Sequence, residues 1–123
     1  MDDQHRRAAL GRDGEQLVAE RLESKGFRIV GRNVRVGRLE LDIIAERAGL
    51  LVFVEVRTRR SDALIHPAET VDHDKQARIK RAALGWLAAR GSRPRAIRFD
   101  VAAVIASRRP GRPTRLHYYP NAF

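Results

Sequence analysis

The chain contains no cysteine, and this absence narrows the chemistry that it can perform. Without thiols there is no disulfide, no thiolate zinc site and no cysteine nucleophile. The sequence also lacks an apolar run near the roughly 20 residues that a membrane span needs. Its first residues lack the apolar stretch of a secretory signal. We therefore expect a soluble, cytoplasmic protein with no membrane partner, whose chemistry rests on carboxylates, histidines and hydroxyls.

Lysine is scarce, whereas arginine is abundant. Only positions 25, 75 and 80 hold lysine, so arginine supplies 22 of the 25 basic residues. Against 15 acids these residues give a net charge of +10, which favours a polyanionic partner and, above all, DNA. A solvated basic surface without a partner is the alternative. Eight arginines between residues 90 and 115 accompany a single acid, Asp100, so the C-terminal part carries most of the excess charge.

A chain of 123 residues is long enough for one hydrophobic core, so we predict a single domain over residues 1–123. Its first half contains one helical and several strand-like patterns. Apolar or small residues at a period near 3.6 predict a helix over residues 7–25, which ends before Gly26. Short segments rich in Val, Ile and Phe predict consecutive strands over residues 27–35, 39–46 and 51–57.

The second half continues with a helix and further strands. Apolar residues repeat at three and four over residues 70–90, with Gly91 beyond the end of this predicted helix. Residues 95–106 predict another strand and residues 116–119 a short edge strand, while Gly31 predicts either a bulge in the first strand or a break that splits it. The order αβββαβ, with a helical crossover, predicts an α/β protein with a partly parallel, mixed sheet. An arginine- and proline-rich loop is expected at about 107–115.

Glu15 is the first of three acids that lie where a solvated charge is not expected. Its neighbours at i+3, i+4 and i+7 are Val18, Ala19 and Leu22, so Glu15 lies on the apolar side of its helix. A glutamate at the boundary of that face, reaching out to water, is the alternative interpretation.

Asp42 and Glu55 are the other two, and both lie in predicted strands. Alternation puts Glu40 and Asp42 on one face, opposite Leu39, Leu41 and Ile43; on an ordinary edge strand that face meets solvent. Glu55 interrupts the most hydrophobic run of the chain, which is typical of a central strand buried on both faces. A carboxylate there is paired, hydrogen-bonded or metal-bound, and an ion pair with Arg57 or another arginine is the alternative to a metal.

Together, Asp42 and Glu55 on neighbouring strands, with Glu15 approaching from a helix, predict a three-carboxylate cluster of the kind that hard divalent cations prefer. Mg²⁺ or Mn²⁺ is the expected cofactor. A cation relieves the repulsion among the acids, polarises a phosphate and lowers the pKa of bound water. These roles fit phosphodiester hydrolysis.

Five segments in order resemble the YraN-like family of uncharacterised bacterial proteins, from about Gly11 to Ile105. They are Gly11-x-x-Gly14-Glu15, Glu40-Leu41-Asp42-Ile43-Ile44-Ala45, Val52-Phe53-Val54-Glu55-Val56-Arg57-x-Arg59, Lys75 and Arg98-Phe99-Asp100-Val101. That family is similar to PD-(D/E)xK nucleases, including archaeal Holliday-junction resolvases. The resemblance implies a restriction-endonuclease-like αβββαβ core, a mixed sheet flanked by helices. It also implies Asp42 and Glu55 as metal ligands, with Glu15 in the helix-borne acidic position.

Two positions depart from the pattern that the resemblance implies. Leu39 stands where the family usually has glycine, and Arg57 stands where active nucleases keep lysine. A guanidinium cannot act as a base, although it can hold a phosphate. Lys75, in the first turn of the second predicted helix, is the candidate substitute, and a surface lysine near a helix start is the alternative.

The predicted function is therefore a Mg²⁺-dependent DNA endonuclease, selective for junctions or repair intermediates. A non-catalytic DNA-binding or repair-accessory protein on a nuclease scaffold is the alternative, and the sequence favours neither a monomer nor a homodimer. The predicted catalytic residues are Glu15, Asp42, Glu55, Arg57 and Lys75. The predicted nucleic-acid contacts are Arg59, Arg60, Arg93, Arg95, Arg108, Arg109 and Arg112.

Overall fold

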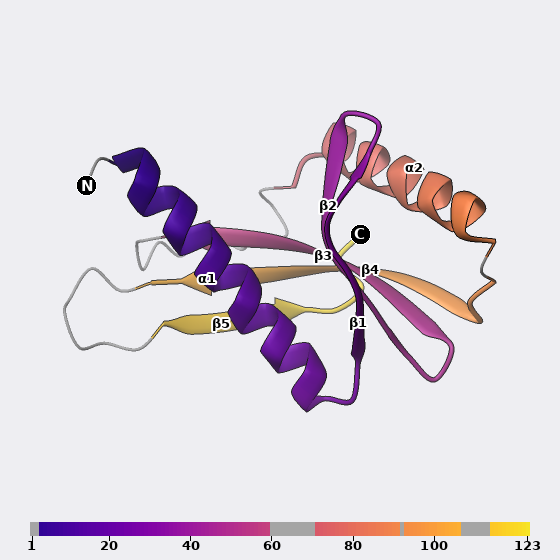
Figure 1. Ribbon diagram of the computed structural model, residues 1–123, viewed down its shortest axis with the longest axis horizontal. Coiled ribbons are helices and arrows are strands. Elements are labelled where there is room, and N and C mark those ends of the chain that lie inside the picture. The colour runs from indigo at the N-terminus through magenta and orange to yellow at the C-terminus, as the bar shows by residue number, and fades with distance from the viewer. Residues whose placement is uncertain (1–2, 60–70, 92, 107–113) are drawn as a thin grey trace.

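The computed structural model describes residues 3–59, 71–91, 93–106 and 114–123, with side chains from Gly14 onward in the first helix. It forms two helices and a five-stranded sheet (Figure 1). In chain order the elements are α1 (Asp3–Ser24), β1 (Arg28–Val36), β2 (Leu39–Arg47), β3 (Leu50–Arg59), α2 (His73–Arg90), β4 (Ala96–Ile105) and β5 (Arg115–Tyr119). The predicted αβββαβ order with one further edge strand is confirmed.

The sheet is mixed, as the helical crossover requires. Its strands lie in the order β1-β2-β3-β4-β5, and only β3 and β4 run parallel. Because α2 connects these two parallel strands, it supplies the crossover that returns the chain to the same end of the sheet. β3 is the middle strand, and its residues 51–55 are all buried. The prediction of a central strand that contains a buried glutamate is confirmed.

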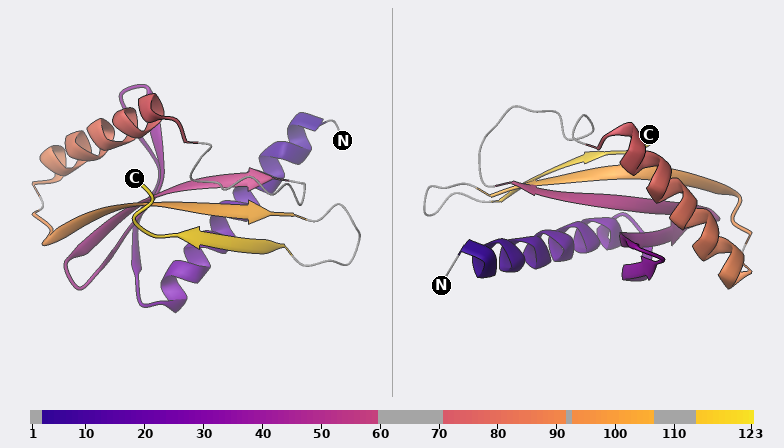
Figure 2. Two further views of the ribbon diagram at one scale, coloured as in Figure 1. Left: turned by 180° about the vertical axis from the view of Figure 1, so that it is seen from behind. Right: turned by 90° about the horizontal axis from the view of Figure 1, so that it is seen from above.

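Two hydrophobic clusters cover the sheet, each associated with one helix. Val18, Ala19 and Leu22 of α1 pack with strand residues such as Val52 and Val104. Ile79, Ala82, Ala83 and Leu87 of α2 pack with a second strand set that includes Phe53 and Val101. Figure 2 shows the two helices on different sides of the sheet. Alternate residues of the buried strands therefore pack against different helices.

Local signals in the sequence have the expected structural counterparts. The register between β1 and β2 shifts between Ile29 and Gly31, which confirms the bulge. α2 ends at Gly91, which adopts the left-handed conformation with φ of 69° and donates its N–H to the Leu87 carbonyl. Within the described ranges, neither helix combines the length and apolar composition that a membrane crossing needs.

β2 separates from β3 partway along its length, and this separation shapes the site. The two strands pair from Arg47 and Leu50 up to Ile43 and Val54. Beyond that pair β2 stays with β1, and Figure 1 shows both running across the direction of β4 and β5. Leu41 consequently packs in the α2-side cluster and Ile43 in the α1-side cluster. Simple alternation, which placed these two side chains on one face, fails here because the strand twists away from its neighbour.

Candidate functional site

Asp42 and Glu55 lie where β2 and β3 separate. They are the residues directly beyond the last pair of the ladder, Ile43 with Val54. An oxygen of the Asp42 carboxylate accepts the backbone N–H of Val56 at 2.8 Å. The side chain of Asp42 therefore accepts a backbone N–H of β3 beyond the point where the backbone of β2 stops pairing with β3.

The two carboxyl groups interact with each other, and this interaction affects the pKa of Asp42. Burial raises the pKa of Asp42 from its ordinary 3.8 to about 7, and the negative charge of Glu55 adds to the shift. A hydrogen bond between the two carboxyl groups acts in the same direction, whereas the N–H of Val56 opposes it. Near neutral pH the pair therefore holds a proton that a cation could replace.

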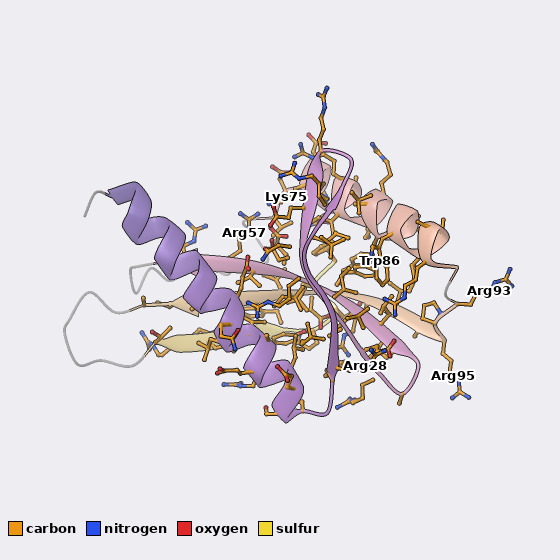
Figure 3. All side chains as sticks on the ribbon, in the orientation of Figure 1. Arg28, Arg57, Lys75, Trp86, Arg93 and Arg95 are labelled. Carbon is orange, nitrogen blue, oxygen red and sulfur yellow. The ribbon has the colours of Figure 1, made fainter. Side chains whose placement is uncertain are left out.

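Two basic side chains approach Glu55 from different elements. The ammonium of Lys75 lies 2.8 Å from Oε1 of Glu55, and Nε of Arg57 lies 3.8 Å from the same oxygen. Figure 3 shows Lys75 and Arg57 together beside the start of α2. Nε of Arg57 is buried and has no hydrogen-bond partner among the described residues. A guanidinium nitrogen held in this way has unused capacity to bind an anion.

The helix start fixes the position of Lys75. Asp72 caps α2, and its Oδ1 accepts the backbone N–H of Lys75 at 2.8 Å. Ile79, one turn further along α2, borders a hollow of about 10 Å³ together with Asp42, Glu55 and Phe53. That volume holds about one water molecule. The acid pair thus has a small space beside it, closed on one side by α2.

Glu15 approaches the site from α1. Gly14 permits this, because a Cβ at that position would lie only 2.8 Å from Oγ1 of Thr58 and 3.4 Å from Val104. Glu15 is half-buried, and its charge contributes to the raised pKa of Asp42. It forms no hydrogen bond or ion pair with a described residue, and the described residues contain no group of three His, Asp or Glu side chains placed to hold a metal. The contacts therefore unite Asp42, Glu55, Arg57 and Lys75, with Glu15 acting at longer range.

The predicted nucleic-acid contacts are spread over the molecule. Arg59 is exposed at the end of β3, two residues beyond Arg57 and so on the same face. Arg93 and Arg95 point outward at the other end of α2 from Lys75 (Figure 3). The remaining predicted contacts, Arg60, Arg108, Arg109 and Arg112, lie outside the described residues.

Asp100 forms a second buried acidic centre, whose partners the sequence did not indicate. Its side chain is completely buried in β4, and Nε and Nη2 of Arg98 donate to its two oxygens at 2.9 Å each. The hydroxyl of Tyr118 and the backbone N–H of Asn121 also donate to this carboxylate. Burial, followed by the hydrogen bond to Asp100, raises the pKa of Tyr118 above its ordinary range. The sequence did contain one signal of this centre, because Asp100 directly precedes the hydrophobic run of β4.

The fold and the acid pair define an α/β protein with a nuclease-like αβββαβ core. The model of the family described as uncharacterised protein family UPF0102 matches residues 14–104, and the chain belongs to this family. UPF0102 is the YraN-like family, so the family membership predicted from the sequence is confirmed.

Relatives in this family match most of the chain. A UPF0102 protein of Anaeromyxobacter dehalogenans is 46% identical over 117 residues, which cover 95% of this chain and 85% of the relative. One of Alkaliphilus metalliredigens is 41% identical over 115 residues, with 94% and 97% covered. One of Chlorobaculum tepidum is 50% identical over 97 residues, with 79% and 75% covered.

Proposed function

We propose that this protein is a Mg²⁺-dependent endodeoxyribonuclease that hydrolyses phosphodiester bonds in branched or repair-intermediate DNA. One observation carries the proposal: Asp42 and Glu55 lie side by side where two central strands separate, with the ammonium of Lys75 2.8 Å from Glu55. Carboxylates whose pKa is raised by burial and by mutual repulsion gather at functional sites more often than at structural ones.

The donor set of the site fits magnesium. Mg²⁺ is commonly held by one or two carboxylates together with substrate phosphates, and it keeps several waters. Asp42 and Glu55 would supply the carboxylates, while Glu15 adds negative charge nearby. When bound, the cation polarises the scissile phosphate and lowers the pKa of a coordinated water. Mn²⁺ has the same ligand preference and is the expected substitute.

The basic residues of the site have separate roles in this proposal. The side chain of Lys75 lies beside the acid pair, so in this proposal its ammonium donates a proton to the leaving oxygen, while the attacking water gives a proton to the carboxylates. A guanidinium does not act as a general acid or base, so Arg57 would neutralise the phosphate without moving a proton. Arg59, exposed two residues further along β3, extends the cationic surface away from the site. The net charge of +10 supports DNA as the polyanion.

A non-catalytic DNA-binding protein is the second candidate, and a specific contact favours it. The ion pair between Lys75 and Glu55 neutralises one carboxylate without any metal, and the proton on Asp42 neutralises the other. Arg57 replaces the lysine of the nuclease pattern. A scaffold that has lost turnover would contain these features.

Cleavage assays with single-stranded, duplex, flap and four-way-junction DNA in Mg²⁺ or Mn²⁺ test the proposal. We expect the wild type to cleave at least one branched substrate. Lys75→Met should lower the rate by at least about 100-fold, the scale of a lost acid–base group. Lys25→Met, which removes a lysine exposed at the end of α1, is the matched control and should retain wild-type activity.

Arg57→Lys separates an active enzyme from an inactive scaffold. In an active enzyme this change should preserve or raise the rate, because Lys75 already supplies the ammonium. An inert wild type in which Arg57→Lys creates cleavage would support the binding protein instead. Wild-type cleavage that persists in Lys75→Met would show that Lys75 has no role in the reaction.

A further inference from the structure

A second hollow lies between α2 and the turn that joins β1 to β2. Its volume is about 320 Å³, and its lining includes the guanidinium-bearing residues Arg38, Arg78 and Arg81. Figure 1 shows the β1–β2 turn beside α2. A hollow of this size is within the usual range for a small-ligand site.

Local geometry brings the three arginines to one hollow. β1 ends at Val36 and β2 begins at Leu39, so Gly37 and Arg38 form a tight turn, with Gly37 at a φ of 61°. Arg78 and Arg81 are three residues apart on α2 and therefore share one face of the helix. The rest of the lining consists of Val36, Gly37, Leu39 and Ala82.

The positive charge of this hollow is not neutralised by the described part of the chain. Arg38, Arg78 and Arg81 are all exposed, and none forms an ion pair or hydrogen bond with a described residue. No acid lines the hollow, and the nearby Glu40 lies 4.0 Å from a different arginine, Arg35. Like charges that converge without a counterion favour the binding of an anion.

The hollow and the acid pair are neighbours along the same seam between α2 and β2. Ile79 borders the hollow beside Asp42 and Glu55, while the adjacent Arg78 borders the arginine-lined one. On β2, Leu39 and Asp42 are three residues apart, which corresponds to about 10 Å of strand. The two hollows are therefore lined by neighbouring residues of α2 and of β2.

We propose that this hollow binds a phosphate group of a nucleic-acid strand through Arg38, Arg78 and Arg81, and so positions the strand relative to Asp42 and Glu55. Guanidinium groups bind phosphate oxygens through paired, charge-assisted hydrogen bonds, and the apolar wall accepts the attached sugar. The identity of the strand rests on the proposed function. The presence of a phosphate site does not, because it follows from the arginines alone.

Calorimetric titration with inorganic pyrophosphate in EDTA tests the phosphate site without any contribution from a metal. We expect the wild type to bind, and Arg78→Gln with Arg81→Gln to lose at least about tenfold in affinity, as expected when hydrogen bonds to a charged group are removed. Arg21→Gln with Lys25→Gln removes the same charge from two exposed positions at the C-terminal end of α1 and should bind like the wild type. Failure of the wild type to bind, or an equal loss in both variants, would overturn the proposal.

Competition with oligonucleotides identifies the source of the phosphate. A 5′-phosphorylated single strand that displaces pyrophosphate better than its unphosphorylated copy indicates a terminal phosphate, and equal displacement indicates an internal one. If neither strand competes, nucleic acid is not the ligand and the proposal fails. Pyrophosphate binding and strand competition together with an inert wild type in the cleavage assay would refute the nuclease alone. If the wild type does not bind pyrophosphate, and cleavage continues unchanged in the Arg78 and Arg81 variant, the phosphate site alone is refuted.

Discussion

The molecule contains two buried acidic centres, which differ in how many hydrogen bonds their carboxyl groups accept from neighbouring residues. Asp100 on β4 receives hydrogen bonds from Arg98, Tyr118 and the backbone of Asn121. The pair formed by Asp42 and Glu55 receives one backbone N–H, and its carboxyl groups also interact with each other, with Lys75 and, at 3.8 Å, with Arg57. Both oxygens of the Asp100 carboxyl group thus accept hydrogen bonds, whereas burial raises the pKa of Asp42 to about 7.

This difference indicates which centre holds the fold together and which is available for binding. A buried carboxylate with all its oxygens occupied has no free position for a ligand, and its network makes the local structure rigid. A pair that retains a proton near neutral pH gains from a cation, because the cation removes both the repulsion and the need for that proton. Buried acids that are not fully compensated are expected at functional positions.

The largest effect that tests this comparison comes from matched, isosteric changes at the two aspartates. Asp100→Asn should lower the free energy of unfolding by about 3 to 5 kcal/mol, since an amide presents its own donors to Arg98 and breaks a buried ion pair. Asp42→Asn at pH 8 should leave the free energy unchanged or raise it, because the amide oxygen still accepts the N–H of Val56 and one negative charge is removed. Urea denaturation of both variants at constant m-value measures the difference.

Equal destabilisation by the two changes would show that both centres are structural. The wild type at the same pH is the reference, and metal is excluded with EDTA, because a bound cation would stabilise the native state and mask the effect.

A smaller effect concerns pH. Because the pKa of Asp42 rises on folding from 3.8 to about 7, the native state holds a proton between these values that the unfolded chain has released. Unfolding free energy therefore decreases as pH rises through this window and levels off above pH 7. The contribution of Asp42 to this decrease is at most about 4 kcal/mol, from a shift of about three pKa units.

Denaturation midpoints between pH 4 and 8, without metal, measure this slope. The Asp42→Asn variant keeps all four histidines of the chain, so the difference between its profile and that of the wild type isolates Asp42. Parallel profiles would contradict the raised pKa. Metal affinity should rise over the same window, because a cation competes with the proton.

Most of the fold follows from periodicity in the sequence. The apolar run broken by Glu55 predicted the central strand, and the helix ending before Gly91 predicted the crossover between parallel strands. These signals are local, because each depends on neighbouring side chains that face one core. The face on which Leu41 lies was predicted wrongly, because the twist of β2 away from β3 depends on the whole sheet.

The sites were predicted less completely, and for a physical reason. Lys75 was expected near the acids because the first turn of a helix can reach the sheet edge, but its contact with Glu55 depends on how α2 docks. Tyr118 reaches Asp100 only because β5 pairs with β4. Arg38 shares a hollow with Arg78 only because the β1–β2 turn lies beside α2. Such long-range contacts leave no periodic signal in the sequence.

The smallest predicted effect tests the ion pair that links the acid pair to α2. Glu55→Gln should lower the unfolding free energy by about 1 kcal/mol, a modest value because Lys75 is 30% exposed and solvent weakens the pair. Lys75→Met leaves a carboxylate that is 8% exposed without its 2.8 Å partner, so it should cost at least as much. Because the two groups interact directly, the double variant should cost less than the sum of the single changes. A double-mutant cycle from urea denaturation measures this coupling, and additive costs would show that Lys75 contributes nothing to stability through Glu55.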